Sequence, residues 1–128
     1  MKITIKQLVK IHQSLLQLSE VKTDIWYAIS KNKAKTKRPF EDYLQVERDC
    51  VDKLALKDET GNVVIHPETG NFIFNTDADA KEFDTKLSEC QSEELEIDFY
   101  TVKITDAFKS ESHAASIIEP LIDIILIE

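Results

Sequence analysis

The fold of this chain is decided by residues 5–29, which read IKQLVKIHQSLLQLSEVKTDIWYAI. Apolar residues recur there in steps of three and four, the spacing of the buried stripe of an amphipathic helix. The stripe consists of Leu8, Ile11, Leu15, Leu18, Lys22, Ile25 and Ile29, and it includes one lysine. We expect the remaining chain to fold back onto this stripe, whether it forms one bent helix or two helices that restart after Thr23.

Composition favours long helices within a single domain spanning residues 1–128. The apolar share of 42% is enough for a modest core, and the 2 glycines and 3 prolines allow few sharp turns. This argues against a sandwich of short strands, a glycine-rich phosphate loop or a dinucleotide fold. We expect Cys50 and Cys90 to be buried free thiols, although their spacing leaves a disulfide open.

The N-terminal residues are polar and periodic, unlike a secretory signal. The longest apolar run, near residues 117–127, is interrupted by Glu119, Pro120 and Asp123 and is too short to span a bilayer. We therefore expect a cytoplasmic protein without membrane contact.

Charge is unevenly distributed along the chain. Residues 1–40 hold nine Lys/Arg and two Asp/Glu, a net charge of +7, whereas residues 41–128 hold seven and 22, a net charge of −15. One interpretation is that a basic helix packs beside acidic elements of the same fold, and this is the one we favour. The alternative is a two-signed surface that recognises a partner.

The densest basic run comprises Lys31, Lys33, Lys35, Lys37 and Arg38. These side chains could meet phosphate, but cations are also favoured at the C-terminal end of a helix. They do not share one helical face, and no aromatic residue is interleaved with them, so a stacking platform for single strands is missing. We do not expect direct nucleic-acid contact. Pro39 disfavours a helical Arg38 and predicts a turn near residues 36–39.

The remaining pattern predicts four further elements after this turn. A second, acidic helix over residues 40–57 would complete an antiparallel helical hairpin over residues 6–57. The near-repeats ETGNVVI and ETGNFIF predict a β-hairpin over residues 62–75, with both glycines in turns. The other predictions are a helix over 77–92 capped by Thr76, a strand over 95–104 with a bulge or bend near residues 99–100, and a C-terminal helix over 117–127, whose isoleucines would also suit a terminal strand.

No catalytic, cofactor-binding or metal-binding pattern is present. His12, His66 and His113 are spread over different elements, and no nucleophile or histidine pair has the required context. Asp77 and Asp79 are explained by the start of a helix. We therefore expect no enzyme, no cofactor and no metal.

Four features follow one another in a fixed order along the chain. They are the segment Lys57-Asp-Glu-Thr-Gly-Asn62, the turn at residues 67–70, an acidic helix containing Phe83, and the acidic strand from Glu94 to Ile97. In this respect the chain resembles a family of small uncharacterised bacteriophage and prophage proteins from Gram-positive hosts, over roughly residues 6–105. The resemblance implies a phage-encoded accessory protein in the host cytoplasm. It implies no activity.

These observations predict an α+β protein, with a long antiparallel helical hairpin, a small antiparallel sheet of about three strands and short additional helices. We expect a non-catalytic protein that binds a host or phage protein, as an inhibitor of defence or replication or as an assembly helper. The alternatives are an acidic DNA mimic that occupies a DNA-binding enzyme, and a small-ligand binder or enzyme with an unrecognised site. A homodimer through the isoleucine-rich C-terminus is a further expectation. The candidate interaction residues are Lys22, Lys31, Lys33, Lys35, Lys37, Arg38, Ile118, Ile122 and Ile125.

Overall fold

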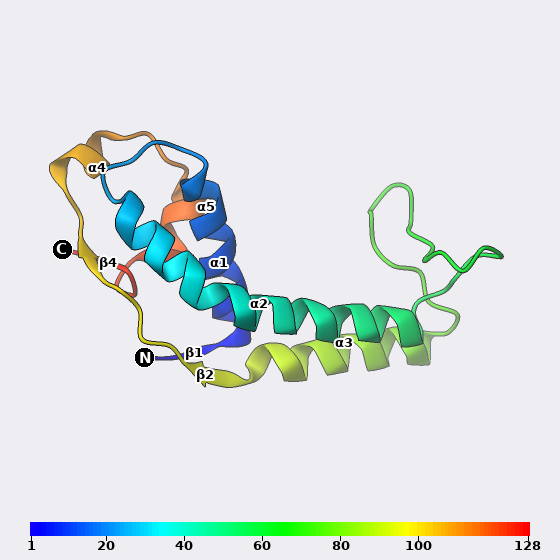
Figure 1. Ribbon diagram of the computed structural model, residues 1–128. Helices are drawn as coiled ribbons and strands as arrows, with labels where there is room; N and C mark the ends of the chain where they lie inside the picture. The colour runs from blue at the N-terminus through cyan, green and yellow to red at the C-terminus, as the bar shows by residue number, and fades with distance from the viewer. The chain divides into compact units, whose positions relative to one another are not determined.

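The computed structural model describes residues 1–128 and is an α+β protein (Figure 1). Its helices are α1 (Ile5–Ser19), α2 (Trp26–Leu54), α3 (Asp77–Ser92), α4 (Asp106–Ser110), α5 (Ala115–Ile118) and the 3-10 helix η1 (Glu119–Leu121). Its strands are β1 (Lys2–Thr4), β2 (Glu94–Glu96), β3 (Val102–Lys103) and β4 (Leu126–Ile127). None of the helices combines the length and the apolar character needed to cross a membrane.

The chain divides into two compact units, where the sequence had been interpreted as one domain. Unit 1 comprises Met1–Glu41 and Glu94–Glu128, and unit 2 comprises Asp42–Glu93. Unit 1 contains the larger core, which is built from α1, the first turns of α2 and the C-terminal segment. The buried members of this core are Ile3, Leu8, Ile11, Leu15, Leu18, Ile25, Ile29, Ile97, Phe108, Leu121, Ile125 and Leu126.

Helix α1 confirms the first part of the predicted stripe. Thr4 caps the helix by accepting a hydrogen bond from the Gln7 amide, while the Gln7 side chain accepts one from the Thr4 amide. The helix ends at Ser19, and the stripe resumes in α2 with Ile25 and Ile29. Of the two forms left open, the structure therefore has two separate helices.

Helix α2 contradicts the predicted turn near residues 36–39. It continues through Pro39 to Leu54, so the helical hairpin of α1 and α2 is connected by residues 20–25. The buried side of α2 passes through Asn32 and Thr36, which are polar yet fully buried. The turn was predicted from Pro39, because proline disfavours a helical conformation of the residue before it, but α2 contains this proline without ending there.

The sheet content is two separate pairs of strands, and the expected three-stranded sheet is not found. In the first pair β1 and β2 are antiparallel, with Ile3 opposite Leu95. In the second pair β3 and β4 are parallel, with Val102 opposite Leu126. The predicted strand over 95–104 is therefore split into β2 and β3 by residues 97–101, which belong to neither strand.

The predicted C-terminal helix over 117–127 is wrong. Helix α5 is followed by the single turn of η1, which has Pro120 in its first positions. Asp123 then adopts a positive φ of 65°, which a continuous α-helix does not allow. The isoleucine-rich end turns back there, and its last residues pair with β3.

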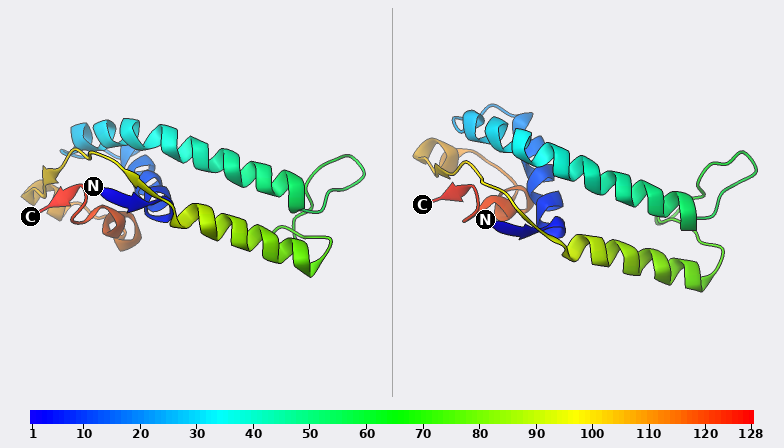
Figure 2. Two further views of the ribbon diagram at one scale, coloured as in Figure 1. Left: turned by 90° about the horizontal axis from the view of Figure 1, so that it is seen from below. Right: turned by 60° about the horizontal axis from the view of Figure 1, so that its bottom comes forward.

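Unit 2 contains the second part of α2 and α3, which lie side by side in both views (Figure 2). Gln91 of α3 donates a hydrogen bond to the Tyr43 hydroxyl of α2 at 2.8 Å, and Phe83 packs against Phe72 and Phe74. The predicted helix over 77–92 is confirmed, with Thr76 as its cap. The predicted hairpin over 62–75 is present as an antiparallel bridge between Ile65 and Phe72, with a hydrogen bond from the Ile73 amide to the Val64 carbonyl beside it and a hydrogen-bonded turn.

Candidate functional site

Three aromatic side chains and one lysine form an exposed cluster on unit 1, which we call the aromatic patch. Trp26 is 64% exposed, Tyr27 48% and Tyr100 41%. The Tyr27 ring meets both others edge to face, with centroid separations of 5.8 Å to Trp26 and 5.6 Å to Tyr100. The Lys31 ammonium lies 5.5 Å and 5.7 Å from the two tyrosine centroids, within the range of a cation–π contact.

Tyr100 is held in the patch by the side chain of Asn32, which has no exposed surface. The Asn32 Oδ1 accepts a hydrogen bond from the Tyr100 amide at 2.8 Å, and its Nδ2 donates to the Tyr100 carbonyl at 2.7 Å. The same Nδ2 also donates to the Ala28 carbonyl in α2 at 2.8 Å. A neighbouring strand would satisfy the Tyr100 backbone in a similar way, so the amide side chain replaces a strand partner in this irregular segment.

Beneath this clamp, a buried chain of polar groups connects α1 to α2. The His12 Nδ1 lies 2.7 Å from the Thr36 Oγ1, which in turn donates to the Asn32 carbonyl at 3.1 Å. The Thr36 proton is used by that carbonyl, so we assign the shared proton of the first contact to His12 Nδ1. Burial lowers the pKa of His12, Lys33 lowers it further, and Glu41 opposes the shift.

The structure brings only part of the predicted basic run to the patch. Lys31 belongs to it, and Lys35 contacts the Asp98 carbonyl in the segment that carries Tyr100. Lys33 is half-buried, while Lys22, Lys37 and Arg38 are exposed outside it. No aromatic residue is interleaved with the basic run in the sequence, but the fold brings Tyr100, 69 residues after Lys31, against it. Tyr27, one helical turn before Lys31, was the sign in the nearby sequence that an aromatic ring could contact this lysine.

The three predicted isoleucines do not share one surface. Ile125 is 1% exposed and belongs to the core of unit 1, whereas Ile122 is 43% exposed. Ile118 is half-buried and packs against the core. A self-association surface at this end can therefore use Ile122 but not Ile125.

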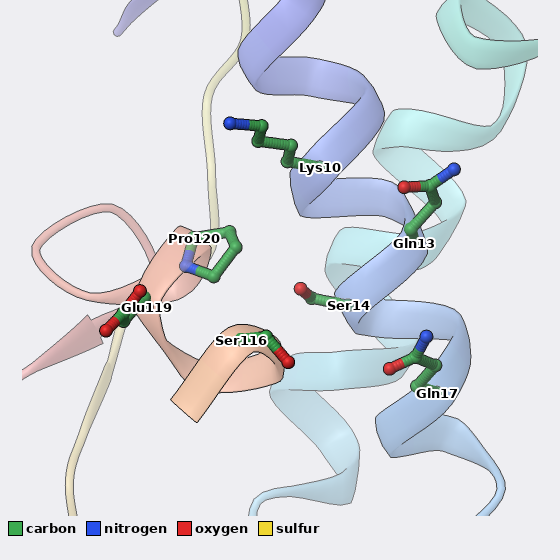
Figure 3. Close-up of a pocket in the computed structure, with 7 residues that line it drawn as sticks. All are labelled: Lys10, Gln13, Ser14, Gln17, Ser116, Glu119 and Pro120. Carbon is green, nitrogen blue, oxygen red and sulfur yellow. The ribbon is translucent and has the colours of Figure 1, made fainter. Parts of the chain in front are cut away.

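A polar groove of about 570 Å³ lies between α1 and the segment formed by α5 and η1 (Figure 3). Figure 3 shows Lys10 and Ser14 extending from α1 toward Pro120 on the other wall. The residues that line the groove are Lys10, Gln13, Ser14, Gln17, Ser116, Glu119 and Pro120.

The groups capable of catalysis or metal binding are scattered over the chain. No set of three His, Cys, Asp or Glu side chains could hold a metal ion. The His113 Nε2 lies 2.7 Å from a carboxylate oxygen of Glu111. Cys50 and Cys90 are half-buried free thiols in unit 2, so the disulfide left open by the sequence is not formed. Burial raises the pKa of the Cys90 thiol, which disfavours the reactive thiolate.

No protein-family model, curated protein or solved structure matches the chain.

Proposed function

We propose that this protein is a non-catalytic binding protein that engages another protein through the aromatic patch. The observation that carries the proposal is the exposure of Trp26, Tyr27 and Tyr100 in one cluster. Tryptophan and tyrosine dominate the energetics of protein interfaces, because they bury a large area at a small cost in side-chain entropy.

The setting of the patch supports this proposal. The Asn32 clamp holds the Tyr100 backbone before any partner arrives, so this segment of backbone loses little conformational entropy on binding. Lys31 adds a positive charge beside the two tyrosines of the patch, which favours a partner surface that carries carboxylates. We include in the proposal a phage-type accessory role in a host cell, with a host or phage protein as the partner.

Affinity capture from host lysate with three baits tests this function. The baits are the unchanged protein, the double variant W26A/Y100A, and the control I65A, which removes an equally exposed apolar residue outside the patch. We expect one protein to be retained at high salt by the unchanged and I65A baits. The double variant should lose about 2 kcal/mol of binding free energy or more, roughly 30-fold in affinity. Equal retention by all three baits would contradict the proposal.

The second candidate is the acidic DNA mimic, and the charge of unit 2 favours it. Unit 2 holds 13 Asp/Glu and five Lys/Arg, a net charge of −8, whereas unit 1 holds 11 of each and is neutral. Competition with DNA for a DNA-binding enzyme, weakening steeply with added salt, would support this role. Inhibition that is independent of salt would exclude it.

A further inference from the structure

The exposed area of the aromatic patch is small for an interface between two folded proteins. Trp26, Tyr27 and Tyr100 are between 41% and 64% exposed. A whole aromatic side chain offers about 150–250 Å², so the three rings together present roughly 300 Å². A stable interface between folded proteins takes about 800 Å² from each side. The patch therefore fits a short linear segment of a partner better than a folded domain or a second copy of this chain.

The backbone beside the patch is not free to pair with an added strand. Strand addition requires unused N–H and C=O groups along an extended segment. Asn32 already bonds both the amide and the carbonyl of Tyr100, and the Lys35 ammonium contacts the Asp98 carbonyl. A linear partner must therefore bind through side chains of the patch.

The patch also lacks the form that receives a helix. A bound helix places several apolar anchors, spaced over two or more turns, in a continuous apolar groove. On α2 the exposed residues that follow the aromatic pair are Ser30, Lys31, Ala34 and Lys35, which are small or charged. They provide no such groove.

The rings themselves suit a proline-rich segment. The Tyr27 ring stands at 90° to Trp26 and at 81° to Tyr100. Two rings at nearly right angles form a corner with two apolar walls, against which a rigid pyrrolidine ring can pack. Segments in the polyproline II conformation dock on such aromatic surfaces and lose little entropy, because the conformation is already formed in the free peptide.

Each ring also carries a hydrogen-bond donor for this type of segment. A polyproline II helix has no internal hydrogen bonds, so its carbonyl groups remain available. Trp26 has an indole N–H, and the two tyrosines have hydroxyl groups. Tyr100 is bonded to Asn32 through its backbone alone, so its hydroxyl can donate to a partner carbonyl.

Lys31 determines the charge that the segment should carry. Its ammonium lies over both tyrosine rings, 5.5 Å and 5.7 Å from their centroids, so the cation–π contacts of these rings are already taken. The ion pairs of the protein are Met1 with Glu96 and His113 with Glu111, so Lys31 has no carboxylate partner. A cationic ligand is therefore disfavoured and a carboxylate is favoured.

We propose that the aromatic patch binds a short proline-rich segment of the partner in the polyproline II conformation, with an acidic residue beside the prolines at Lys31. This inference rests on the proposed function, since it names the kind of partner that the same patch receives. A contact of this size implies a weak affinity for an isolated segment, on the order of 0.1–1 mM.

The probe is the peptide EPPPPPE, acetylated and amidated at its ends. The matched peptides are QPPPPPQ, KPPPPPK and EAAAAAE. Titration into the ¹⁵N-labelled protein should give saturable amide shifts at residues 26–31 and 98–101. We expect the glutamine peptide to bind roughly two- to fivefold more weakly, because it lacks one exposed ion pair. The lysine peptide should be weaker still, and the alanine peptide should give no saturable shifts.

Variants assign the aromatic and the charged contacts. W26A should abolish the binding of all four peptides. K31M should bind EPPPPPE and QPPPPPQ equally, whereas K31R, which keeps the charge, should retain the preference for glutamate. The matched control K37M removes an exposed lysine of the same helix outside the patch and should change nothing. Unchanged amide shifts in the rest of the protein show that each variant is folded.

Absence of saturable shifts at the patch up to roughly 10 mM would overturn the inference, as would equal binding of the proline and alanine peptides. A preference for glutamate that survives in K31M would also contradict it. Each of these results leaves the proposed function in place if the W26A/Y100A bait loses the captured protein. Equal capture by all three baits would instead remove the proposed function.

Discussion

Asn32 is the residue on which the geometry of the aromatic patch depends. Its side chain supplies both hydrogen bonds of the Tyr100 backbone from inside the fold. Replacing it with leucine keeps a similar volume but leaves a donor and an acceptor unpaired, each costing about 1–3 kcal/mol. We expect N32L to lower the free energy of unfolding by about 2–4 kcal/mol, measured by urea denaturation.

Ser30 provides the control for this change, because it is an exposed residue of the same helix. S30A should stay within about 0.5 kcal/mol of the unchanged protein. If N32L is as stable as S30A, the clamp does not hold Tyr100.

His12 makes stability depend on pH in a defined direction. Its pKa is lowered from the usual 6.5 by burial, so the folded protein takes up this proton at lower pH than the unfolded chain. Stability from this group is therefore complete above pH 6.5 and falls as the pH drops through 6.5 toward the lowered value. The variant H12N, which keeps an N–H near Thr36, should lose less stability over this interval.

The test is to measure the free energy of unfolding of the unchanged protein and of H12N above and below pH 6.5. Carboxylates titrate in both proteins, so only the change in the gap between the two curves reports on His12. A gap that stays constant across the interval would show that His12 does not couple pH to folding.

At the scale of elements, α2 is unusual because it contains Pro39 in its interior. Proline removes one hydrogen bond of the helix and disfavours it by about 3 kcal/mol relative to alanine. We expect P39A to raise the free energy of unfolding by up to about 3 kcal/mol. K37A, an exposed change two residues earlier, is the control, with an expected change within about 0.5 kcal/mol. A destabilised P39A would mean that packing of the ring outweighs its cost to the helix.

In the C-terminal segment Ile125 is buried in the core, whereas Ile122 is exposed. I125A removes a buried side chain and should cost about 2–5 kcal/mol in unfolding experiments. I122A should stay within about 0.5 kcal/mol, because Ile122 is exposed. Equal losses would contradict the observed turn at Asp123, which separates the environments of these two residues. I122D, followed by molar mass in solution, tests the homodimer expected from the sequence, since a dimer through this end should dissociate.

The elements that the sequence predicted well are those whose pattern is local. Leu8, Ile11 and Leu15 repeat every three to four residues, and Thr76 with Asp79 marks the start of α3. The elements it missed depend on distant partners. Pro39 predicted a turn near residues 36–39, yet α2 continues through it, and buried Asn32 and Thr36 connect this part of the helix to Tyr100 and His12.

The aromatic patch was missed for a similar reason. Lys31 and Tyr27 are visible as neighbours on one helix, but Tyr100 reaches them only through the fold. The C-terminal isoleucines suited either a helix or a strand, but Ile117 and Ile118 lie in α5 and only Leu126 and Ile127 pair with β3. The pattern of neighbouring residues cannot predict a contact between segments that are far apart in the sequence.

At the scale of the whole molecule, the two units differ in how many residues their helices bury. Helix α1 has six buried residues, whereas α3 has only Phe83. Local opening is easier where few side chains are buried. We expect the amides of α3 to exchange with deuterium markedly faster than those of α1, in native-state exchange followed by NMR. Equal protection of both helices would show that the units open as one.

The central claim is that the aromatic patch is the surface that meets the partner, and Trp26 allows a direct test because it is the only tryptophan of the chain. Its fluorescence should be measured during titration with the protein captured by the unchanged bait. Binding at the patch predicts an emission shift to shorter wavelength and protection from iodide quenching, because the indole leaves water. Saturable binding with unchanged Trp26 emission and quenching would place the partner elsewhere and contradict the claim.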